Sequence, residues 1–562
     1  MKRKIILAVL VSVLFFTSFN SVIALAYARF NRALNGSSKS VVASYNTIWV
    51  PDNYTTIQEA INNASERDTI LVRAGTYYEH VVVDKDLSLV GENKHETIID
   101  GRGTGIVVSV RANNITLSGF TIQNGSLGIW LDGSTNSILT GNTVSSNIHY
   151  GIWLYHSIDN VLSGNDASNN RYGILVGDSD NNVLSGNDAS NNDYGIYLDH
   201  SINNVLSGND ASNNDYGIYL YYSSNNVTGN YASNNEYGIL VGSSDNNVLF
   251  DNYASNNSYG IYFWHSSNNV LLDNYASNNS YGIYLDYSDN NIIFHNNFIN
   301  NTEPPSSIDS VDFFDNGVEG NYWSDYNGAD ANWDGIGDTP YLLDENSQDN
   351  YPLIGPFSEF DVKIENQFYT VDVVCNSTIS NFQCCYDAGN QTNVVNFMVN
   401  GTEGKGFCRI CVPHALIEPP YTVTIDRNPP LYNNTVRTNG THTWLYFTYH
   451  HSEHEVMIIH MPTPPPEQPA FWSEWWFWTI IALAVIVVVL LSLSIKQKKA
   501  IQAYERELRS YLYRARALFK ADVKKRRAKI EEFKRKYNMD IRTADTLEDF
   551  FKRWEFKKKV KH

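Results

Sequence analysis

Aromatic and acidic side chains recur at a regular spacing between residues 128 and 286, and together they could hold a sugar polymer. The position after each of eight Gly-Ile pairs is aromatic in six copies, and the position two residues further along is aromatic or acidic in six. Flat rings stack on sugar faces, and carboxylates accept hydrogen bonds from sugar hydroxyls. We therefore predict a glycan-binding face formed by Trp130, Trp153, Tyr155, Tyr197, Asp199, Tyr219, Tyr221, Tyr262, Trp264 and Tyr284. Alternatively, tyrosine is simply a good strand residue here, or a neighbouring protein covers the stripe.

A short acidic segment after the repeats has the spacing of a calcium-binding loop. Oxygen-bearing side chains fall at loop positions 1, 3, 5 and 9, a backbone carbonyl at position 7 and a glycine at position 6. Hard oxygen ligands of this kind favour calcium over zinc or copper. The predicted ligands are Asp330, Asn332, Asp334, the carbonyl of Ile336, and Asp338. Position 12 is Tyr341 rather than the glutamate of an EF-hand, so a plain acidic turn is the alternative.

The charge of the repeat region limits its partners and its chemistry. The whole chain has a formal net charge of -19, and residues 112–361 contain 30 Asp and Glu, a single Arg171 and no Lys. Such an acidic surface excludes nucleic acid as a partner. It also argues against a uronate lyase or a polygalacturonase, because those enzymes use cationic side chains to hold a carboxylate and stabilise negative charge.

The sequence does not reveal side chains at catalytic or copper-binding distances. Asp199 and Asp286 are about four turns apart, roughly 19 Å, whereas a glycoside hydrolase needs its two carboxylates about 5 to 10 Å apart. His156, His200 and His265 share a position in the repeat but lie two and three turns apart, too far for one ion. We therefore expect no copper site.

The repeat that carries these residues predicts a parallel β-helix. Its glycines fall at 128, 151, 173, 195, 217, 238, 260 and 282, at steps of 21 to 23 residues. A unit this short cannot bury its few apolar residues alone, so its copies must stack. Strand alternation turns Ile196 and Leu198 inward and Tyr197 outward. One asparagine in each repeat, such as Asn187, is expected to bond the equivalent amide of the next turn.

The segments that flank the repeats resemble a known family. Ile57-Gln58-Glu59-Ala60 predicts a short capping helix, residues 72–77 read Val-Arg-Ala-Gly-Thr-Tyr, and residues 320–326 read Gly-Asn-Tyr-Trp-Ser-Asp-Tyr. Together with the repeats, these motifs in residues 48–357 resemble the NosD-like right-handed parallel β-helix family. The resemblance implies an all-β fold, here of about ten turns, with repeats shared by carbohydrate-binding proteins and sugar hydrolases. It is weak evidence for any particular activity.

The remaining segments predict a membrane-anchored organisation. Residues 359–460 contain short alternating strands that predict a β-sandwich, similar to modules of archaeal surface proteins. A proline-rich linker at 461–470 leads to an apolar run at 471–495, long enough for one transmembrane helix. The tail at 496–562, which we predict to be helical, holds 23 Lys and Arg against 10 Asp and Glu, which places it in the cytoplasm. Residues 1–28 are typical of a signal peptide, so we expect a single-pass plasma-membrane protein with its large N-terminal part outside.

Cysteines and glycosylation motifs agree with this orientation. All five cysteines precede the apolar run, and they allow two disulfides and one free thiol, with the pairing open: Cys375, Cys384, Cys385, Cys408 and Cys411. All fourteen Asn-x-Ser/Thr motifs also precede it, although an asparagine-rich repeat produces such motifs by composition alone. The glycosylation candidates include Asn53, Asn114, Asn226, Asn256, Asn278, Asn376, Asn390, Asn400, Asn433 and Asn439.

These observations favour a surface protein that binds a glycan or another envelope component without catalysis. The alternative is a glycoside hydrolase or lyase that acts along the same face of the β-helix. The predicted partners are therefore a glycan or an envelope protein, together with the membrane through one C-terminal helix.

Overall fold

The structure is a computed structural model that describes residues 46–344, 347–364, 367–387, 392–402 and 404–460. All of these residues lie within one compact unit of the chain, residues 1–462. The predicted signal peptide, linker, membrane helix and basic tail lie outside the described residues. Within the described ranges, no helix is both long and apolar enough to cross a bilayer.

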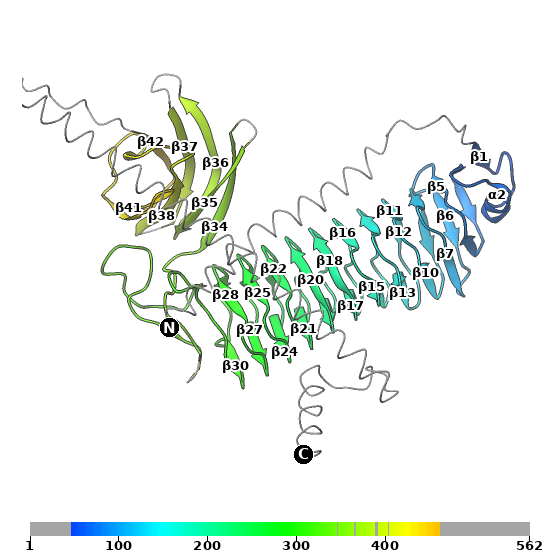
Figure 1. The fold of residues 1–562 in the computed structure, drawn as a ribbon, viewed down its shortest axis with the longest axis horizontal. Helices are drawn as coiled ribbons and strands as arrows, with labels where there is room; N and C mark the ends of the chain where they lie inside the picture. Colours follow the sequence, from blue (N-terminus) through cyan, green and yellow to red (C-terminus); the bar gives the residue numbers. More distant parts are fainter. Residues whose placement is uncertain (1–45, 345–346, 365–366, 388–391, 403, 461–562) are drawn as a thin grey trace, which may run out of the picture. The chain divides into compact units, whose positions relative to one another are not determined.

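The first part of the described chain is a parallel β-helix of the right-handed type, in which successive strands stack along one axis (Figure 1). Its longest sheet, here the first sheet, contains β1 (Thr47–Val50), β2 (Thr69–Val72), β5 (Ser88–Gly91), β8 (Thr116–Ser118), β11 (Ile138–Thr140), β14 (Val161–Ser163), β16 (Val183–Ser185), β18 (Ile202–Ser207), β20 (Ser224–Thr228), β22 (Val248–Phe250), β25 (Val270–Leu272) and β28 (Ile292–Phe294). Twelve strands in one sheet exceed the predicted ten turns. The estimate was low because β1 and β2, at the start of the β-helix, lack the signature of the repeats and were not counted.

The second sheet is built from the Tyr-Gly-Ile segments of the repeat. Its eleven strands are β4 (Val81–Val83), β7 (Ile106–Val110), β10 (Leu127–Asp132), β13 (Tyr150–Tyr155), β15 (Tyr172–Gly177), β17 (Tyr194–Asp199), β19 (Tyr216–Tyr221), β21 (Tyr237–Gly242), β24 (Tyr259–Trp264), β27 (Tyr281–Asp286) and β30 (Ser306–Ile308). Every repeat pairs in register with the next, so that Ile174, Ile196 and Ile218 align. This register fixes which side chains share a face along the whole sheet.

The third face consists of two four-stranded sheets joined by isolated bridges. Their strands are β3 (Gly75–Tyr77), β6 (Thr97–Asp100), β9 (Thr121–Gln123), β12 (Thr143–Val144), β23 (Tyr253–Ser255), β26 (Tyr275–Ser277), β29 (Asn297–Ile299) and β31 (Tyr322–Trp323). Bridges between equivalent residues of successive turns, such as Asp166 and Asp188, continue the face between β12 and β23. A short helix, α2 (Ile57–Asn63), buries Ile57 and Ile61 near the first turns, as its motif predicted.

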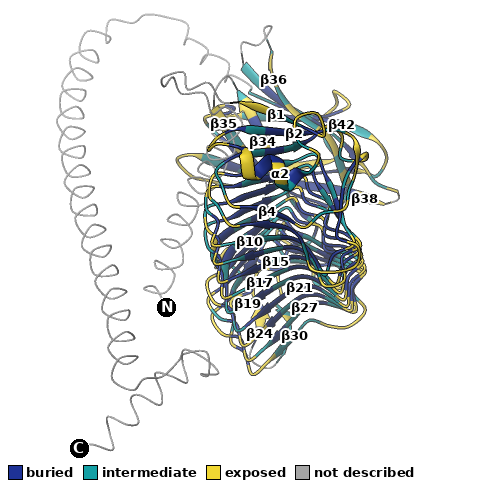
Figure 2. Ribbon diagram, turned by 90° about the vertical axis from the view of Figure 1, so that its right-hand side faces the viewer, coloured by how far each residue is buried: buried dark blue, intermediate teal, exposed yellow. Residues whose placement is uncertain are grey.

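The interior combines an apolar stack with ladders of polar side chains. Ile196 and Leu198 are fully buried in one continuous core, as the alternation predicted, and Figure 2 shows the strands mostly buried and the bends exposed. The Nδ2 atom of Asn187 donates to Leu162 O at 3.0 Å and to Asn209 Oδ1 at 2.9 Å, and the same pattern repeats from turn to turn. The predicted asparagine ladder is therefore present. Because each buried amide bonds the next one, the ladder avoids the free-energy cost of unpaired polar groups.

Two sheets of antiparallel strands follow the β-helix and face each other as in a β-sandwich. One has the order β34 (Phe357–Ile364), β35 (Gln367–Cys375), β38 (Lys405–Pro413), β41 (His442–His450) and β40 (Tyr432–Thr438). The other has the order β36 (Thr378–Asp387), β37 (Thr392–Asn400), β42 (His454–His460) and β39 (Tyr421–Ile425). A small two-stranded sheet, β32 (Tyr341–Leu342) with β33 (Gln348–Asp349), lies between the two parts in the sequence. Phe397 and Phe447 lie in the sandwich core.

Candidate functional site

The outer surface of the second sheet brings the predicted aromatic and acidic residues into two parallel columns. The central column is Trp130, Trp153, Leu175, Tyr197, Tyr219, Leu240, Tyr262 and Tyr284, and the edge column is Asp132, Tyr155, Gly177, Asp199, Tyr221, Gly242, Trp264 and Asp286. Most of these side chains are half-buried, and Trp264 is 37% exposed. Every predicted glycan-binding residue thus belongs to one continuous surface.

A third column, not singled out in the sequence analysis, lies beside the central one. The residue before the repeat glycine is tyrosine in seven successive turns, here called the tyrosine ladder: Tyr150, Tyr172, Tyr194, Tyr216, Tyr237, Tyr259 and Tyr281. Tyr194 and Tyr216 stack with ring centroids 4.7 Å apart and an angle of 3° between their planes, and their neighbours stack similarly. The signal was present in the sequence as an almost unbroken tyrosine at one repeat position.

Stacking determines which parts of the rings are free to contact a ligand. Tyr197 lies 4.9 Å from Tyr219 and also contacts Tyr194, so the faces of the rings in the middle of the sheet lie against one another. Such offset stacks stabilise the sheet by about 0.5 to 1.5 kcal/mol per pair. The surface therefore presents ring edges and hydroxyl groups, where the sequence suggested free ring faces. The binding role itself stays a prediction.

The hydroxyl groups of this surface remain protonated at ordinary pH. Burial, reinforced by neighbouring acidic and phenolic groups, raises the pKa of Tyr197, Tyr219 and Tyr262 above the usual range. They can therefore donate hydrogen bonds. Tyr262 Oη lies 3.5 Å from Asp286 Oδ2, at the limit of a hydrogen bond.

The carboxylates of the edge column do not form a catalytic pair. Asp199 lies on β17 and Asp286 on β27, with β19, β21 and β24 between them in the sheet. The partner of Asp199 is instead His200, whose Nδ1 lies 2.6 Å from Asp199 Oδ1. His156, His200 and His265 each occupy the bend after a second-sheet strand, so their separation follows the turns as predicted. Within the part of the chain that the structure describes, no three His, Cys, Asp or Glu side chains form a group that could hold a metal ion.

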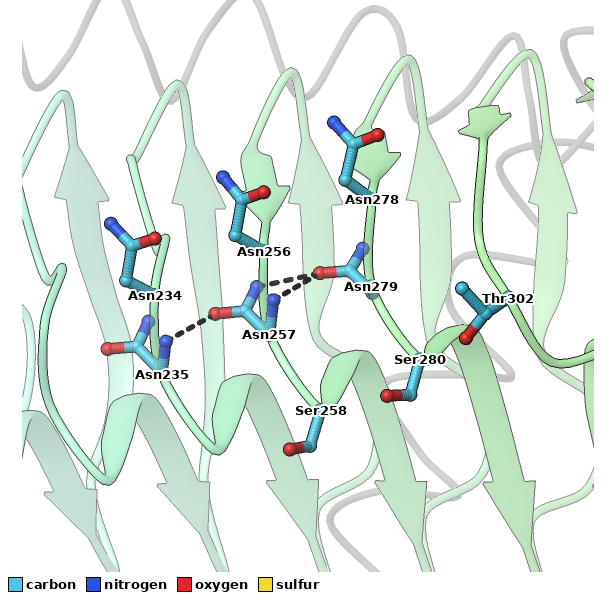
Figure 3. Close-up of a pocket in the computed structure, with 9 residues that line it drawn as sticks. All are labelled: Asn234, Asn235, Asn256, Asn257, Ser258, Asn278, Asn279, Ser280 and Thr302. Atoms are coloured by element: carbon cyan, nitrogen blue, oxygen red, sulfur yellow. Dashed lines mark hydrogen bonds between the residues drawn. The ribbon is translucent and has the colours of Figure 1, made fainter.

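A polar trough runs along the bend that precedes the tyrosine ladder, near the end of the β-helix (Figure 3). It has a volume of about 520 Å³ and is lined by Asn234, Asn235, Asn256, Asn257, Ser258, Asn278, Asn279, Ser280 and Thr302. Asn235, Asn257 and Asn279 belong to a buried ladder in which the backbone N–H of one residue donates to Oδ1 of the next, whereas Asn234, Asn256 and Asn278 are exposed. The trough adjoins the ladder in sequence, because Tyr259 and Tyr281 follow Ser258 and Ser280.

The acidic loop is held by its own backbone and by the sandwich. Asp330 accepts hydrogen bonds from the N–H groups of Asp334 and Gly335, and Asp338 accepts one from Ala331. Trp333, at the tip of the loop, lies 5.2 Å from the Tyr432 ring, and the Lys405 ammonium lies 3.9 Å from the Trp333 ring. These contacts are consistent with an acidic turn that fastens the loop to the sandwich, and calcium binding stays a prediction.

A buried group of charges joins the last turns of the β-helix to the sandwich. Glu319, in the segment before β31, accepts a hydrogen bond from the Arg409 guanidinium of β38 at 2.5 Å, and its other oxygen lies 3.0 Å from His295 Nε2. Burial alone would raise the pKa of Glu319, but the Arg409 charge and His295 hold it below its usual range. Nothing in the sequence pattern indicated this pair.

Two of the five predicted cysteines are neighbours. Cys375 on β35 pairs in register with Cys408 on β38, and their buried thiols are in hydrogen-bonding contact. Cys384 and Cys385 lie on β36 of the other sheet, and Cys411 pairs with Asp372. All five are free thiols in this structure, so disulfide formation stays a prediction. Cys375 and Cys408 are direct cross-strand partners, and the pairing of the cysteines stays open.

The predicted glycosylation sites occupy several different environments. Asn226 lies half-buried within β20, whereas Asn256 and Asn278 lie at exposed bends. Others are exposed but engaged in hydrogen bonds: Asn53, Asn114, Asn376 and Asn439. Asn400 and Asn433 are exposed on the sandwich, and Asn390 lies outside the described residues.

Comparison with known proteins agrees with the fold and is sparse on function. A family model described as "Periplasmic copper-binding protein (NosD)" matches residues 34–231 and 176–328, more than half of the chain. A "Cell surface glycoprotein" of Methanothermus fervidus is 34% identical over 92 residues, which is 16% of this chain and 15% of that protein.

Solved structures give only distant matches. The Azotobacter vinelandii mannuronan C-5 epimerase AlgE4 A-module is 17% identical, with 46% of this chain and 92% of that chain covered and a TM-score of 0.37. A mannuronic acid specific polysaccharide family 6 lyase from human gut microbiota is 14% identical, with 50% and 80% covered and a TM-score of 0.38.

Proposed function

The chain belongs to the NosD family, and we propose that it is a cell-surface protein whose β-helix binds a glycan or another envelope component without catalysing a reaction. In this proposal residues 1–28 direct the chain out of the cell, residues 471–495 anchor it in the plasma membrane, and the basic tail stays in the cytoplasm. The surface location is supported by the short match to a cell surface glycoprotein, of which it spans 15%.

The observation that carries the proposal is the aromatic surface of the second sheet. The central column extends from β10 to β27 and the tyrosine ladder from β13 to β27, and both repeat once per turn, about every 4.8 Å. A polymer lying along the axis would meet the same edges and hydroxyl donors at each turn. Exposed aromatic surface of this density commonly marks a binding site.

The charge of this surface selects the class of glycan. Asp132, Asp199 and Asp286 border the central column, and residues 112–361 contain only one cationic side chain besides histidine, Arg171. Arg171 is engaged by Asp193, 3.4 Å away. A polyanionic glycan would therefore be repelled, whereas a neutral or amino-bearing glycan would find carboxylate acceptors and phenol donors.

The family description names copper, but the described residues do not fit a copper site. Histidines at equivalent bends are separated by whole turns, too far apart to share one copper ion. We therefore assign copper no role in the proposed function. Calcium at Asp330, Asn332, Asp334, Ile336 and Asp338 remains part of the proposal as a stabilising ion.

A binding assay with the full-length protein tests the proposal. The protein is incubated with a panel of neutral, amino-bearing and acidic polysaccharides, and both retention and the release of shorter products are measured. Changing Tyr197 and Tyr219 together to leucine, the residue found at 175 and 240, should weaken retention by up to about tenfold. Tyr231→Leu, an exposed tyrosine of the third face, is the matched control and should leave retention unchanged.

The same assay distinguishes the alternative. Release of shorter products would identify a polysaccharide-degrading enzyme in place of a binding protein. If no glycan is retained, an envelope protein is left as the partner of this surface. If Tyr231→Leu weakens retention as much as the double change does, the assignment of the binding site to the second sheet is contradicted.

A further inference from the structure

One bend of the β-helix carries an asparagine in seven successive turns. These residues are Asn169, Asn191, Asn213, Asn234, Asn256, Asn278 and Asn300, here called the bend column. All seven residues are exposed, and their φ angles lie between 52° and 60°. Asparagine tolerates this left-handed conformation at a bend, and the exposure of all seven residues makes them accessible from solvent.

The residue two positions after each of these asparagines changes character along the axis. In the first four turns it is charged, namely Arg171, Asp193, Asp215 and Glu236, and in the last three it is Ser258, Ser280 and Thr302. An acceptor for N-glycosylation needs a hydroxyl residue at this position. The change therefore creates three acceptor motifs on three consecutive turns, at Asn256, Asn278 and Asn300.

The side-chain amides also differ along the column. Asn169 and Asn191 donate from Nδ2 to Ser168 and Ser190, at 2.9 and 3.0 Å. Among the described residues, the other five members of the bend column have no such side-chain partner, and these include Asn256, Asn278 and Asn300. Figure 3 shows Asn256 and Asn278 separate from the hydrogen-bonded ladder that joins Asn235, Asn257 and Asn279. The nitrogen that would be modified is thus free and exposed at the motifs.

We propose that Asn256, Asn278 and Asn300 carry N-linked glycans on three successive turns, and that the first sugars at Asn256 and Asn278 occupy the polar trough, which these two residues line. The inference rests on the proposed location outside the cell. The trough supplies the space, because its lining includes Asn256, Asn278 and the hydroxyl residues Ser258, Ser280 and Thr302.

The donor is a lipid-linked oligosaccharide phosphate. The Nδ2 atom of the asparagine forms a bond to the anomeric carbon of the first sugar, and the bond between that carbon and the phosphate oxygen breaks. The lipid phosphate leaves with the bonding electron pair, and the amide gives one proton to a base of the transferring enzyme. No oxidant or reductant is needed.

Modification would restrict the surface that is open to other ligands. Tyr259 and Tyr281 follow Ser258 and Ser280 directly, so glycans in the trough would lie next to the last two rings of the tyrosine ladder. The part of the ladder from Tyr150 to Tyr237 lies beside the charged turns and stays open. The proposed ligand would therefore bind to the earlier turns.

Mass spectrometry of peptides from the full-length protein isolated from its own cells provides the test. We expect peptides that contain Asn256, Asn278 and Asn300 to carry a sugar mass. Ser258→Ala should abolish modification at Asn256, with Asn278 and Asn300 still modified. Unmodified peptides at all three positions would overturn the inference, whether or not other motifs carry sugar.

Extending the column by one turn gives a sharper test. Glu236→Ser creates an acceptor at Asn234, which has the same bend geometry with φ of 59°, and should produce a sugar mass there. Glu236→Ala removes the same charge without an acceptor and should leave Asn234 unmodified. Failure of Glu236→Ser to be modified would contradict the role of the bend. Polysaccharide retention, measured separately, distinguishes this failure from a failure of the proposed function.

Discussion

The β-helix and the sandwich bury polar groups in different ways. In the β-helix, the buried polar residues are mostly Asn and Ser, and most of the buried asparagines bond the equivalent residue of the next turn, as Asn165 does with Asn187. In the sandwich, Arg409 is 4% exposed and depends on Glu319 of the other part of the chain. A periodic sequence can thus supply hydrogen-bond partners to neutral buried groups by repeating one residue at the same position of each turn, whereas a buried charge needs a specific partner.

The largest effect should come from breaking that specific pair. Arg409→Met leaves Glu319 buried without its guanidinium partner, and loss of one member of a buried pair costs about 3 to 5 kcal/mol. We expect a correspondingly lower unfolding midpoint in urea. Arg171→Met, which removes a half-exposed partner of Asp193, is the control and should have little effect. Equal effects of the two changes would show that the junction does not depend on the Glu319 pair.

The next largest effect is the difference in stability between changing an inward and an outward residue of the same β-helix strand. Leu198 is fully buried, so Leu198→Ala should lower the free energy of unfolding by about 2 to 5 kcal/mol. Tyr197 is half-buried and has Tyr219 and Tyr194 as ring neighbours, so Tyr197→Leu should cost about 0.5 to 1.5 kcal/mol for each ring pair that is lost. Thermal unfolding measures both. Similar losses would indicate that the stacked rings carry as much of the fold as the inner stack.

A smaller effect should depend on pH at the junction. Burial, followed by the nearby charges of Glu359, Asp372 and Asp251, raises the pKa of Asp273 well above its usual range. Its side chain is 12% exposed, and its nearest cationic partner is His295 at 3.8 Å. Because the folded state holds the proton of Asp273 more tightly than the unfolded state does, the contribution of this group to the free energy of unfolding is greatest at pH values near and below the usual carboxyl pKa. It falls as the pH rises through the raised pKa, by up to about 1.4 kcal/mol per pH unit.

Asp273→Asn provides the measurement of that effect. The amide cannot ionise, so the unfolding midpoint should vary less between pH 4 and 8 than in the unchanged protein. Asp215→Asn, at an exposed bend, is the control and should keep the original slope. Glu319 has the opposite effect at pH values below the usual carboxyl pKa. Its pKa is lowered in the folded state, so it stabilises the fold only while its carboxylate is ionised, and this stabilisation is lost as the pH falls. An unchanged slope in Asp273→Asn would assign the pH dependence to other groups.

The sequence predicts the periodic part of the molecule well because one rule applies to every turn. The inward Ile196 and Leu198, the ladder through Asn187 and the register of the central column are confirmed. The mutual stacking of the rings was missed, since spacing fixes which residues share a face but not the rotation of their planes. The pair of Arg409 and Glu319 was also missed, because residues ninety positions apart with no repeat leave no pattern to recognise.

The smallest effect concerns the acidic loop, where the two parts of the chain meet. The carboxylate of Asp330 already accepts backbone hydrogen bonds, and Trp333 already contacts Tyr432. The conformation of the loop is therefore largely fixed before an ion binds. If calcium binds the folded loop, tenfold excess over its dissociation constant should stabilise the protein by about 1.4 kcal/mol and raise the melting temperature accordingly. Changing Asp330 and Asp334 to Asn should abolish this response while preserving side-chain size, and magnesium, with its smaller shell, should not replace calcium. Calorimetry without saturable binding at millimolar calcium would leave the loop as a turn that contacts the sandwich through Trp333 and binds no ion.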